Sequence, residues 1–134
     1  MAKIGYLLLC EDVYKEKELI IKKPYNTIAP ISIPGNFSFV MVFSVIELEE
    51  KEDYSVEIKG QDPNGKNIIE PQNIDFSLPS DERFKDRPIG SASFNLTYTN
   101  TVFEVEGTYT FTVTVNGKNS KTAEIPVHPA GKYR

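Results

Sequence analysis

The sequence alternates between apolar and polar side chains through much of its length, and this pattern limits the fold more than any other feature. Over residues 108–115, tyrosine, phenylalanine and valine take every second position and threonine fills the positions between them. Successive side chains of a β-strand point to opposite faces, so such a segment has one buried and one solvated face. Similar runs recur over 54–59, 74–78 and 92–99, and no segment of useful length has helical periodicity. About eight or nine short strands separated by turn signals predict an all-β sandwich or barrel without substantial helix.

Two segments are apolar on both faces and are expected to be covered on both sides. Residues 4–10 form a nearly continuous apolar run, and residues 37–48 place phenylalanine and methionine on one face and mostly valine on the other. Between them, residues 23–36 contain three prolines, which lack the amide donor that a central strand needs. We therefore expect residues 23–36 to form a connection that crosses from one sheet to the other.

In the last hairpin, the alternation of apolar residues in the two strands does not fit a plain two-residue turn. A plain two-residue turn at Asn116-Gly117 would place polar residues of the last strand opposite the apolar face of residues 109–115. A bulge or a loop one residue longer would set Phe111 opposite Ala123 and would keep both core faces on one side. The sequence therefore predicts an irregularity between Asn116 and Lys121.

Size and charge narrow the class of protein. The chain has 134 residues, which suits one domain spanning residues 1–134, and we expect residues 129–134 to form a flexible tail. Its formal net charge is −4 and its basic residues are scattered, whereas binding to nucleic acid or to an acidic membrane needs clustered lysine and arginine. We therefore expect neither nucleic acid nor membrane as a partner.

Cysteine usage indicates a reducing compartment. Cys10 is the only cysteine, so no intramolecular disulfide can form, and we predict a cytoplasmic location. Residues 7–10 superficially match a lipoprotein attachment site, but Leu9 is too bulky for the position before that cysteine and the upstream apolar stretch is too short. No apolar run approaches the ~18 residues of a membrane-spanning helix.

Two resemblances to known families make the predicted fold more specific. Gly107-Thr108-Tyr109-Thr110-Phe111 resembles the Gly-x-Tyr-x-Cys stretch of immunoglobulin-type sandwiches, with Phe111 in place of the cysteine, and the chain has no tryptophan. The resemblance implies an immunoglobulin-like or fibronectin-III-like antiparallel β-sandwich in which Tyr109 is a structural tyrosine corner, bonded to backbone a few residues upstream. Nearly the whole chain is also similar to a family of small bacterial proteins of unknown function, through GYLLLCEDV at the start, a proline-containing entry to a long apolar strand, and the closing GTYTFTVTVNG. That likeness implies a bacterial or phage-derived domain and no activity.

No group of residues predicts catalysis, a cofactor or a metal. The single histidine, His128, lies near the end of the chain without a serine or cysteine motif to pair with. Gly117-Lys118 lacks the second glycine and the following helix of a phosphate-binding loop. Acidic residues within 47–53 offer oxygen atoms to calcium, but alternation sends neighbouring strand side chains to opposite faces. We expect a solvated acidic loop, and calcium binding there stays an alternative.

The best candidates for binding lie in long loops. Residues 79–90 form the longest segment without periodicity, and Phe84 lies there between Arg83 and Arg87. Aromatic and arginine side chains are enriched in binding surfaces, so these three residues form a candidate interaction surface, with Tyr25 of the proline-rich segment as a weaker candidate. The alternative is that Phe84 folds back and fixes the loop to the sandwich.

These observations favour a non-catalytic module that binds a protein, identity unknown, through its loops or through an exposed edge strand. Edge strands also offer a route to a homo-oligomer. A small-ligand binder or an enzyme with a pocket of scattered residues is one alternative, and a structural or cell-envelope component is another.

Overall fold

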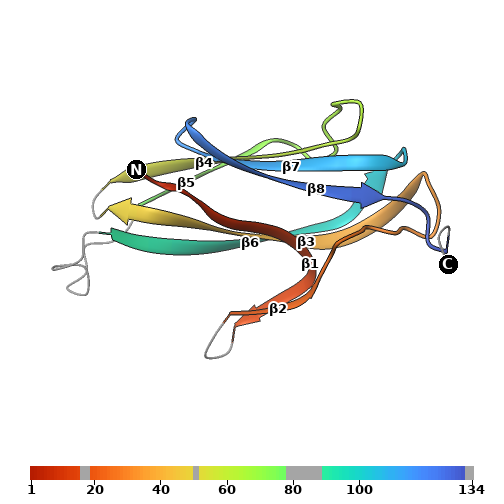
Figure 1. Cartoon of the computed structure of the whole chain (residues 1–134), viewed down its shortest axis with the longest axis horizontal. Coiled ribbons are helices and arrows are strands. Elements are labelled where there is room, and N and C mark those ends of the chain that lie inside the picture. Colours follow the sequence, from red (N-terminus) through yellow and green to blue (C-terminus); the bar gives the residue numbers. More distant parts are fainter. Residues whose placement is uncertain (16–18, 50–51, 78–88, 132–134) are drawn as a thin grey trace.

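The protein is a sandwich of two antiparallel sheets (Figure 1). The computed structural model describes residues 1–15, 19–49, 52–77 and 89–131. Within these residues there are eight strands and no helix, which confirms the all-β prediction, so no helix there could cross a membrane. The strands are β1 (Lys3–Lys15), β2 (Leu19–Pro24), β3 (Gly35–Glu49), β4 (Asp53–Gln61), β5 (Gln72–Ser77), β6 (Ile89–Phe103), β7 (Gly107–Val115) and β8 (Asn119–Val127). Sheet A has the order β2-β1-β3-β6, and sheet B has the order β5-β4-β7-β8.

The main core lies between the two sheets and follows the alternation of the sequence. Phe39 of β3 and Phe111 of β7 meet edge to face with ring centroids 5.6 Å apart, and both side chains are fully buried. The threonines of β7 lie on the opposite, outer face of sheet B. There Thr114 Oγ1 lies 2.7 Å from Ser120 Oγ of β8, so the polar face of the strand is a cross-strand hydroxyl ladder.

The β7–β8 hairpin has the register that the alternation of apolar residues predicts. Phe111 pairs with Ala123, and the turn is one residue longer than a two-residue turn, because Val115 pairs with Asn119. Asn116 and Gly117 have φ angles of 51° and 67°, a left-handed region that asparagine and glycine tolerate. The irregularity between Asn116 and Lys121 is therefore confirmed.

Strand β1 bends away from the sandwich halfway along its length. Its first half pairs with β3 as far as Cys10, and its second half pairs only with β2. We call this hairpin, Cys10–Lys15 with β2, the arm; Figure 1 shows it projecting from the outer face of sheet A, with β2 lowest in the view. Val13 and Ile21 of the arm pack against the outward side chains of Val40 and Val42. The arm is thus a partial third layer, and it buries the second apolar face of β3.

The proline-rich connection does not cross between sheets, so that prediction is wrong. It joins β2 to β3, and both strands belong to sheet A. On the way it contacts the edge of sheet B, where Ile28 N donates to Pro126 O at 3.0 Å and Ile28 is fully buried. The apolar Ile28 fixes the segment against β8 although the prolines exclude it from the ladder.

The C-terminal segment is held at its start. Ala130 N donates to Pro30 O at 2.7 Å, so the chain still contacts the proline-rich connection at residue 130. Residues 132–134 lie outside the described residues.

The outer edge of β8, the last strand of sheet B, is covered by the start of β1. Asn119 Nδ2 donates to Ala2 O at 2.8 Å and Lys121 Nζ donates to Gly5 O at 3.0 Å, which joins β8 to the start of β1 across the side of the sandwich.

Candidate functional site

The sequence predicts an interaction surface in the loop that follows β5. Arg83, Phe84 and Arg87 lie outside the described residues. The strand residues on either side of their segment are at one end of the sandwich, where Ser77 pairs with Asp53 and Ile89 pairs with Glu49.

Tyr25 lies at the other end and has a structural environment. Its ring packs edge to face on Phe37 at 5.4 Å, and its backbone N donates to Leu9 O at 2.7 Å. Burial, followed by the nearby carboxylate of Glu11, raises the pKa of the Tyr25 hydroxyl. Phe37 lies near the start of β3, so Tyr25 lies far from Glu49 at the other end of that strand.

Tyr109 lies at the start of β7 and bonds to the chain upstream. Its hydroxyl donates to Val105 O at 2.8 Å, and the side chain is fully buried against Phe103. Burial raises the pKa of the Tyr109 hydroxyl, so it stays protonated and keeps its donor role at neutral pH. The bond ties the connection between β6 and β7 to the core.

A Tyr109→Phe substitution tests how much this hydrogen bond contributes to the stability of the fold. Because the carbonyl of Val105 would lose a donor inside the protein, we expect a loss of about 1–2 kcal/mol in the free energy of unfolding. Urea denaturation followed by circular dichroism measures the change. Tyr6→Phe is the matched control, since the Tyr6 hydroxyl makes only an exposed 3.4 Å contact with Ser93 Oγ. Equal losses in the two variants would contradict a special role for Tyr109.

The residues considered for catalysis or metal binding are dispersed or occupied. Glu47 forms an ion pair with Lys3 at 3.5 Å, and within the described ranges no three residues of the metal-ligating types gather around one point. Burial raises the pKa of the Cys10 thiol, so the thiol is protonated at neutral pH and a weak nucleophile. Asp53 and Asp75 line a broad hollow of about 470 Å³ on the outer face of sheet B, and no third ligating residue joins them among those described.

The feature that the fold exposes most clearly is the edge of β6. This strand has 15 residues and ends the order of sheet A, so in the described part of the chain only β3 pairs with it. An edge strand presents unpaired backbone N–H and C=O groups, which can pair with another chain.

Proteins usually protect such edges, and the other three edge strands follow that rule. Strand β2 carries Lys22, Lys23 and Pro24, β8 contains Pro126 and is covered by the start of β1, and β5 is only six residues long. Lysine, proline, shortness and coverage all discourage edge pairing.

Within the residues that the structure describes, strand β6 has none of these protections. Its sequence, IGSASFNLTYTNTVF, contains no charged residue and no proline. Register shifts against β3 fall near its two ends and leave a regular run from Ala92 to Tyr98. Long, uncharged and regular, β6 is suited to accept another strand.

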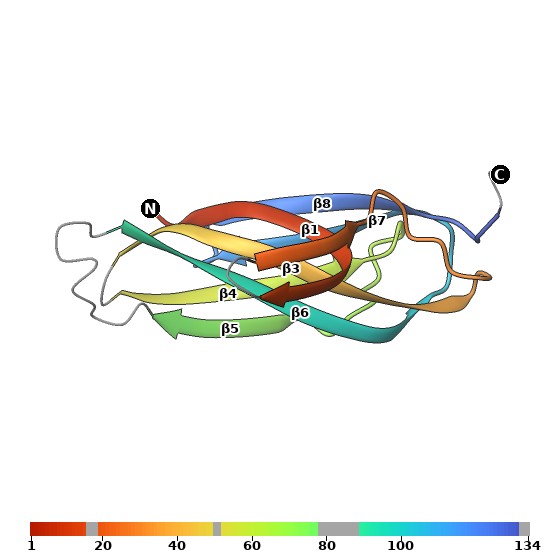
Figure 2. The same ribbon diagram turned by 90° about the horizontal axis from the view of Figure 1, so that it is seen from below.

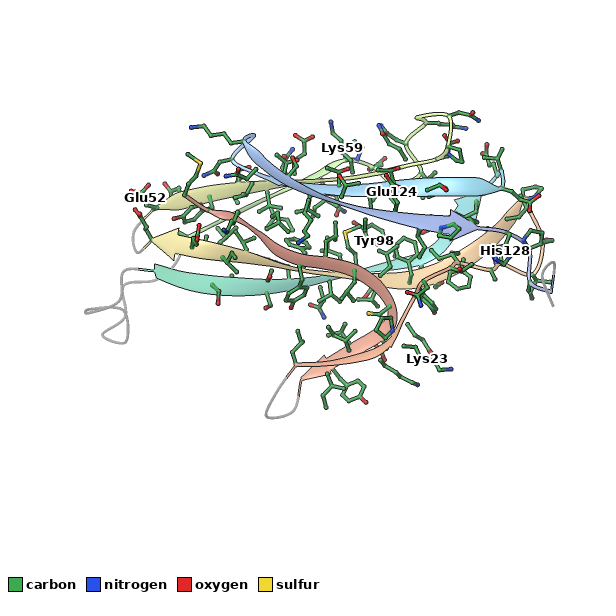
Figure 3. The ribbon with its side chains drawn as sticks, viewed as in Figure 1. Lys23, Glu52, Lys59, Tyr98, Glu124 and His128 are labelled. Carbon is green, nitrogen blue, oxygen red and sulfur yellow. The ribbon has the colours of Figure 1, made fainter. Side chains whose placement is uncertain are left out.

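Half-buried side chains border this edge on the core side. Phe76 of β5 and Phe94 of β6 meet at 5.0 Å, and Tyr98 Oη donates to Gln72 Oε1 at 3.3 Å, so the two edge strands lie side by side across the sandwich (Figure 2). Figure 3 shows Tyr98 between the sheets, and burial raises the pKa of its hydroxyl. We call this row of half-buried side chains the seam; it consists of Ile74, Phe76, Phe94, Leu96 and Tyr98.

A groove borders the same edge on the outer side. It has a volume of about 370 Å³ and lies between the arm and the outer face of β6, lined by Val13, Tyr14, Leu19, Ser93 and Asn95. Tyr14 and Leu19 are 45% and 37% exposed, so two large hydrophobic side chains of the groove are open to solvent. The edge of β6 thus runs between two partly apolar surfaces, the seam and the arm groove.

Sequence reasoning missed this site because no residue in it carries a chemical motif. The available signal was the absence of lysine, arginine, aspartate, glutamate and proline over residues 89–103. That absence has meaning only once the sheet order shows that the strand is at an edge.

Comparison with known proteins identifies a family without a known role. The family model described as "Family of unknown function (DUF6941)" matches residues 5–128. No curated protein sequence matches the chain significantly.

Among solved structures, the similarity is to part of a larger enzyme. The β-glucosidase from Listeria innocua in complex with isofagomine superimposes with a TM-score of 0.52 at 8% identity, over 94% of this chain and 16% of that chain. A mutant of that enzyme in complex with laminaribiose gives a TM-score of 0.53 at 8% identity, over 95% of this chain and 16% of that chain. The chain therefore spans about a sixth of those proteins, and the likeness concerns the fold alone.

Proposed function

The chain belongs to the DUF6941 family of unknown function, and we propose that it is a non-catalytic protein-interaction module that binds an extended segment of a protein along the edge of β6. The observation that carries the proposal is the unprotected edge itself, 15 residues long and without charge or proline. An added strand gains main-chain hydrogen bonds along the edge, and side-chain pockets on either side give it specificity. The seam and the arm groove would supply those pockets.

The fold that presents this edge is, in our proposal, of the immunoglobulin or fibronectin-III type. The neighbours β1-β3-β6 and β4-β7-β8 have the order of strands A-B-E and C-F-G in that topology. Strand β2 is an addition beside β1, and β5 lies beside β4 instead of beside β6 as strand D would. In the part of the chain that the structure describes, no strand takes the D position beside β6. The bond from Tyr109 to Val105 has the form of a tyrosine corner and supports the same assignment.

We propose the cytoplasm of a bacterium as the location. The support is the single thiol of Cys10, which is buried and protonated and has no second cysteine to pair with. Such a chain needs no oxidising compartment to fold.

A capture experiment with matched variants tests the interaction role. The tagged protein would be incubated with lysate of source cells, and bound proteins would be identified by mass spectrometry. Asn95→Lys with Thr97→Lys adds two charges to the exposed outer face of β6 and should abolish capture, because lysine discourages edge pairing. Backbone amides of β6 should also gain protection from hydrogen exchange in the complex.

The control places the same pair of charges on an interior strand. Thr110→Lys with Thr112→Lys lies on β7, which has β4 and β8 on its two sides, and should capture the same proteins as the wild type. A third variant, Phe84→Ala with Arg87→Ala, separates the loop from the edge. Capture that survives the β6 lysines and is lost in the loop variant would refute the edge proposal in favour of the loop.

A further inference from the structure

We propose that the segment that pairs with β6 is β6 of a second copy of this chain, in an antiparallel arrangement with its two-fold axis at Asn95. This inference rests on the function proposed above and names the partner of the same edge. The argument depends on charge, on the regular part of the strand and on the groove beside it.

The absence of charge on β6 is what self-pairing requires. In a two-fold interface each residue near the axis faces its own copy or a close neighbour of it, so any charge there would oppose a like charge. The chain has a formal net charge of −4, yet none of its charged residues lies within Ile89–Phe103. Two copies can therefore bring this strand together without opposing charges inside the ladder.

The regular run of the strand fixes the register. Bulges against β3 leave Ala92–Tyr98 as an uninterrupted stretch, and its midpoint is Asn95. A two-fold axis there sets Asn95 opposite Asn95 of the second copy and Phe94 opposite Leu96 of the second copy. The amide groups can then hydrogen-bond on the outer face, while an aromatic side chain meets an aliphatic one on the core side.

On the core side the pairing would also cover the seam. Phe94 and Leu96 are half-buried in one chain, and Phe94 already contacts Phe76 of β5 at 5.0 Å. Bringing the two seams together would remove these apolar surfaces from water, which favours association.

On the outer side the second copy would extend the floor of the arm groove. Ser93 and Asn95 form part of that floor, and in the proposed register they face Thr97 and Asn95 of the second copy. These small polar side chains would lie beside the exposed Tyr14 and Leu19 of the arm. In an isolated chain no second copy lies beside the groove, which explains why Tyr14 and Leu19 of the arm remain exposed.

The oligomeric state of the purified full-length protein is the first test. Sedimentation equilibrium should give twice the mass of one chain, and Asn95→Lys should raise the dissociation constant of the dimer about tenfold or more, because it opposes two lysines at the axis. Asn95→Glu should do the same. Circular dichroism confirms that both variants are folded, as expected for an exposed position.

Mixing the two variants tests the register. Asn95→Lys and Asn95→Glu should each be weakened alone and should recover the mass of a dimer when mixed, since opposite charges then meet at the axis. As a second measurement, oxidation of Asn95→Cys should crosslink two chains, whereas Thr112→Cys on interior strand β7 should not. The native Cys10 is fully buried and is present in both variants.

Three outcomes would overturn the inference: a monomer at all concentrations, a dimer unaffected by Asn95→Lys, or failure of the mixed variants to recover. A monomer whose β6 lysine variant still loses capture of another protein would refute self-pairing and leave the interaction role standing. Loss of neither property in the β6 variants would refute both.

Discussion

Replacing Val42 with aspartate should remove about 3–5 kcal/mol from the free energy of unfolding, which is a large part of the stability of a typical domain. Val42 points to the outer face of sheet A, yet its side chain is 0% exposed because the arm covers it. An aspartate there would bury a carboxylate beneath the apolar side chains of Val13 and Ile21. Urea denaturation followed by circular dichroism measures the loss.

The matched control lies directly across the ladder. Asn95 of β6 pairs with Val42 of β3 and points to the same outer face, but it is exposed. At a protein concentration at which the chain is monomeric, Asn95→Asp should therefore change the free energy of unfolding by less than about 0.5 kcal/mol. If Val42→Asp cost as little as Asn95→Asp, the arm would not cover the sheet in solution.

Replacing Phe111 with alanine should cost about 3–5 kcal/mol, the range for removal of a buried aromatic ring. The ring packs edge to face on Phe39 at 5.6 Å and lies over Gly60 of the neighbouring strand β4. A Cβ added at Gly60 would lie 2.9 Å from Phe111 Cε1 and 3.1 Å from Ile69 Cγ1, so the ring fills most of the space that a side chain at Gly60 would need. Removing the ring leaves a cavity that Gly60 cannot fill, and denaturant unfolding should report the loss.

A second substitution makes this expectation specific to the ring. Gly60→Ala alone should be destabilising, because the ring blocks the added methyl group, whereas in the Phe111→Ala background it should recover part of the lost stability. Such coupling between residues in contact is expected from shared space. Thr112→Ala, one residue along on the outer face, should cost less than about 1 kcal/mol. Strictly additive effects of Gly60→Ala and Phe111→Ala would contradict this account of the packing.

Much of the fold could be predicted because local patterns are dictated by burial. Alternation in β7 predicts which side chains enter the core, and the need to keep both core faces together predicts the longer turn after Val115. The apolar outer face of β3 predicts coverage on both sides. The covering element could not be predicted, because Val13 and Ile21 reach Val42 only through a bend of β1 that no local pattern encodes.

The candidate site, too, could be predicted only in part. The sequence directed attention to Phe84 and its arginines, which lie outside the described residues, and to Tyr25, which packs on Phe37. It gave no reason to select Asn95 or Leu96, since both belong to an ordinary amphipathic strand. An uncharged strand is unremarkable in the middle of a sheet, where both neighbours use its backbone groups, and becomes a binding surface only at an edge.

By itself, then, the sequence determined that this protein is built from strands, which faces of those strands are apolar, and where the last hairpin needs an extra residue, because side-chain period and burial act over a few neighbouring residues. Only the tertiary structure decided that β6 ends the order of sheet A, that the arm covers Val42, and that Tyr14 and Leu19 stay exposed in the groove beside β6. These properties depend on which distant segments become neighbours, and that choice is made by the packing of the whole chain.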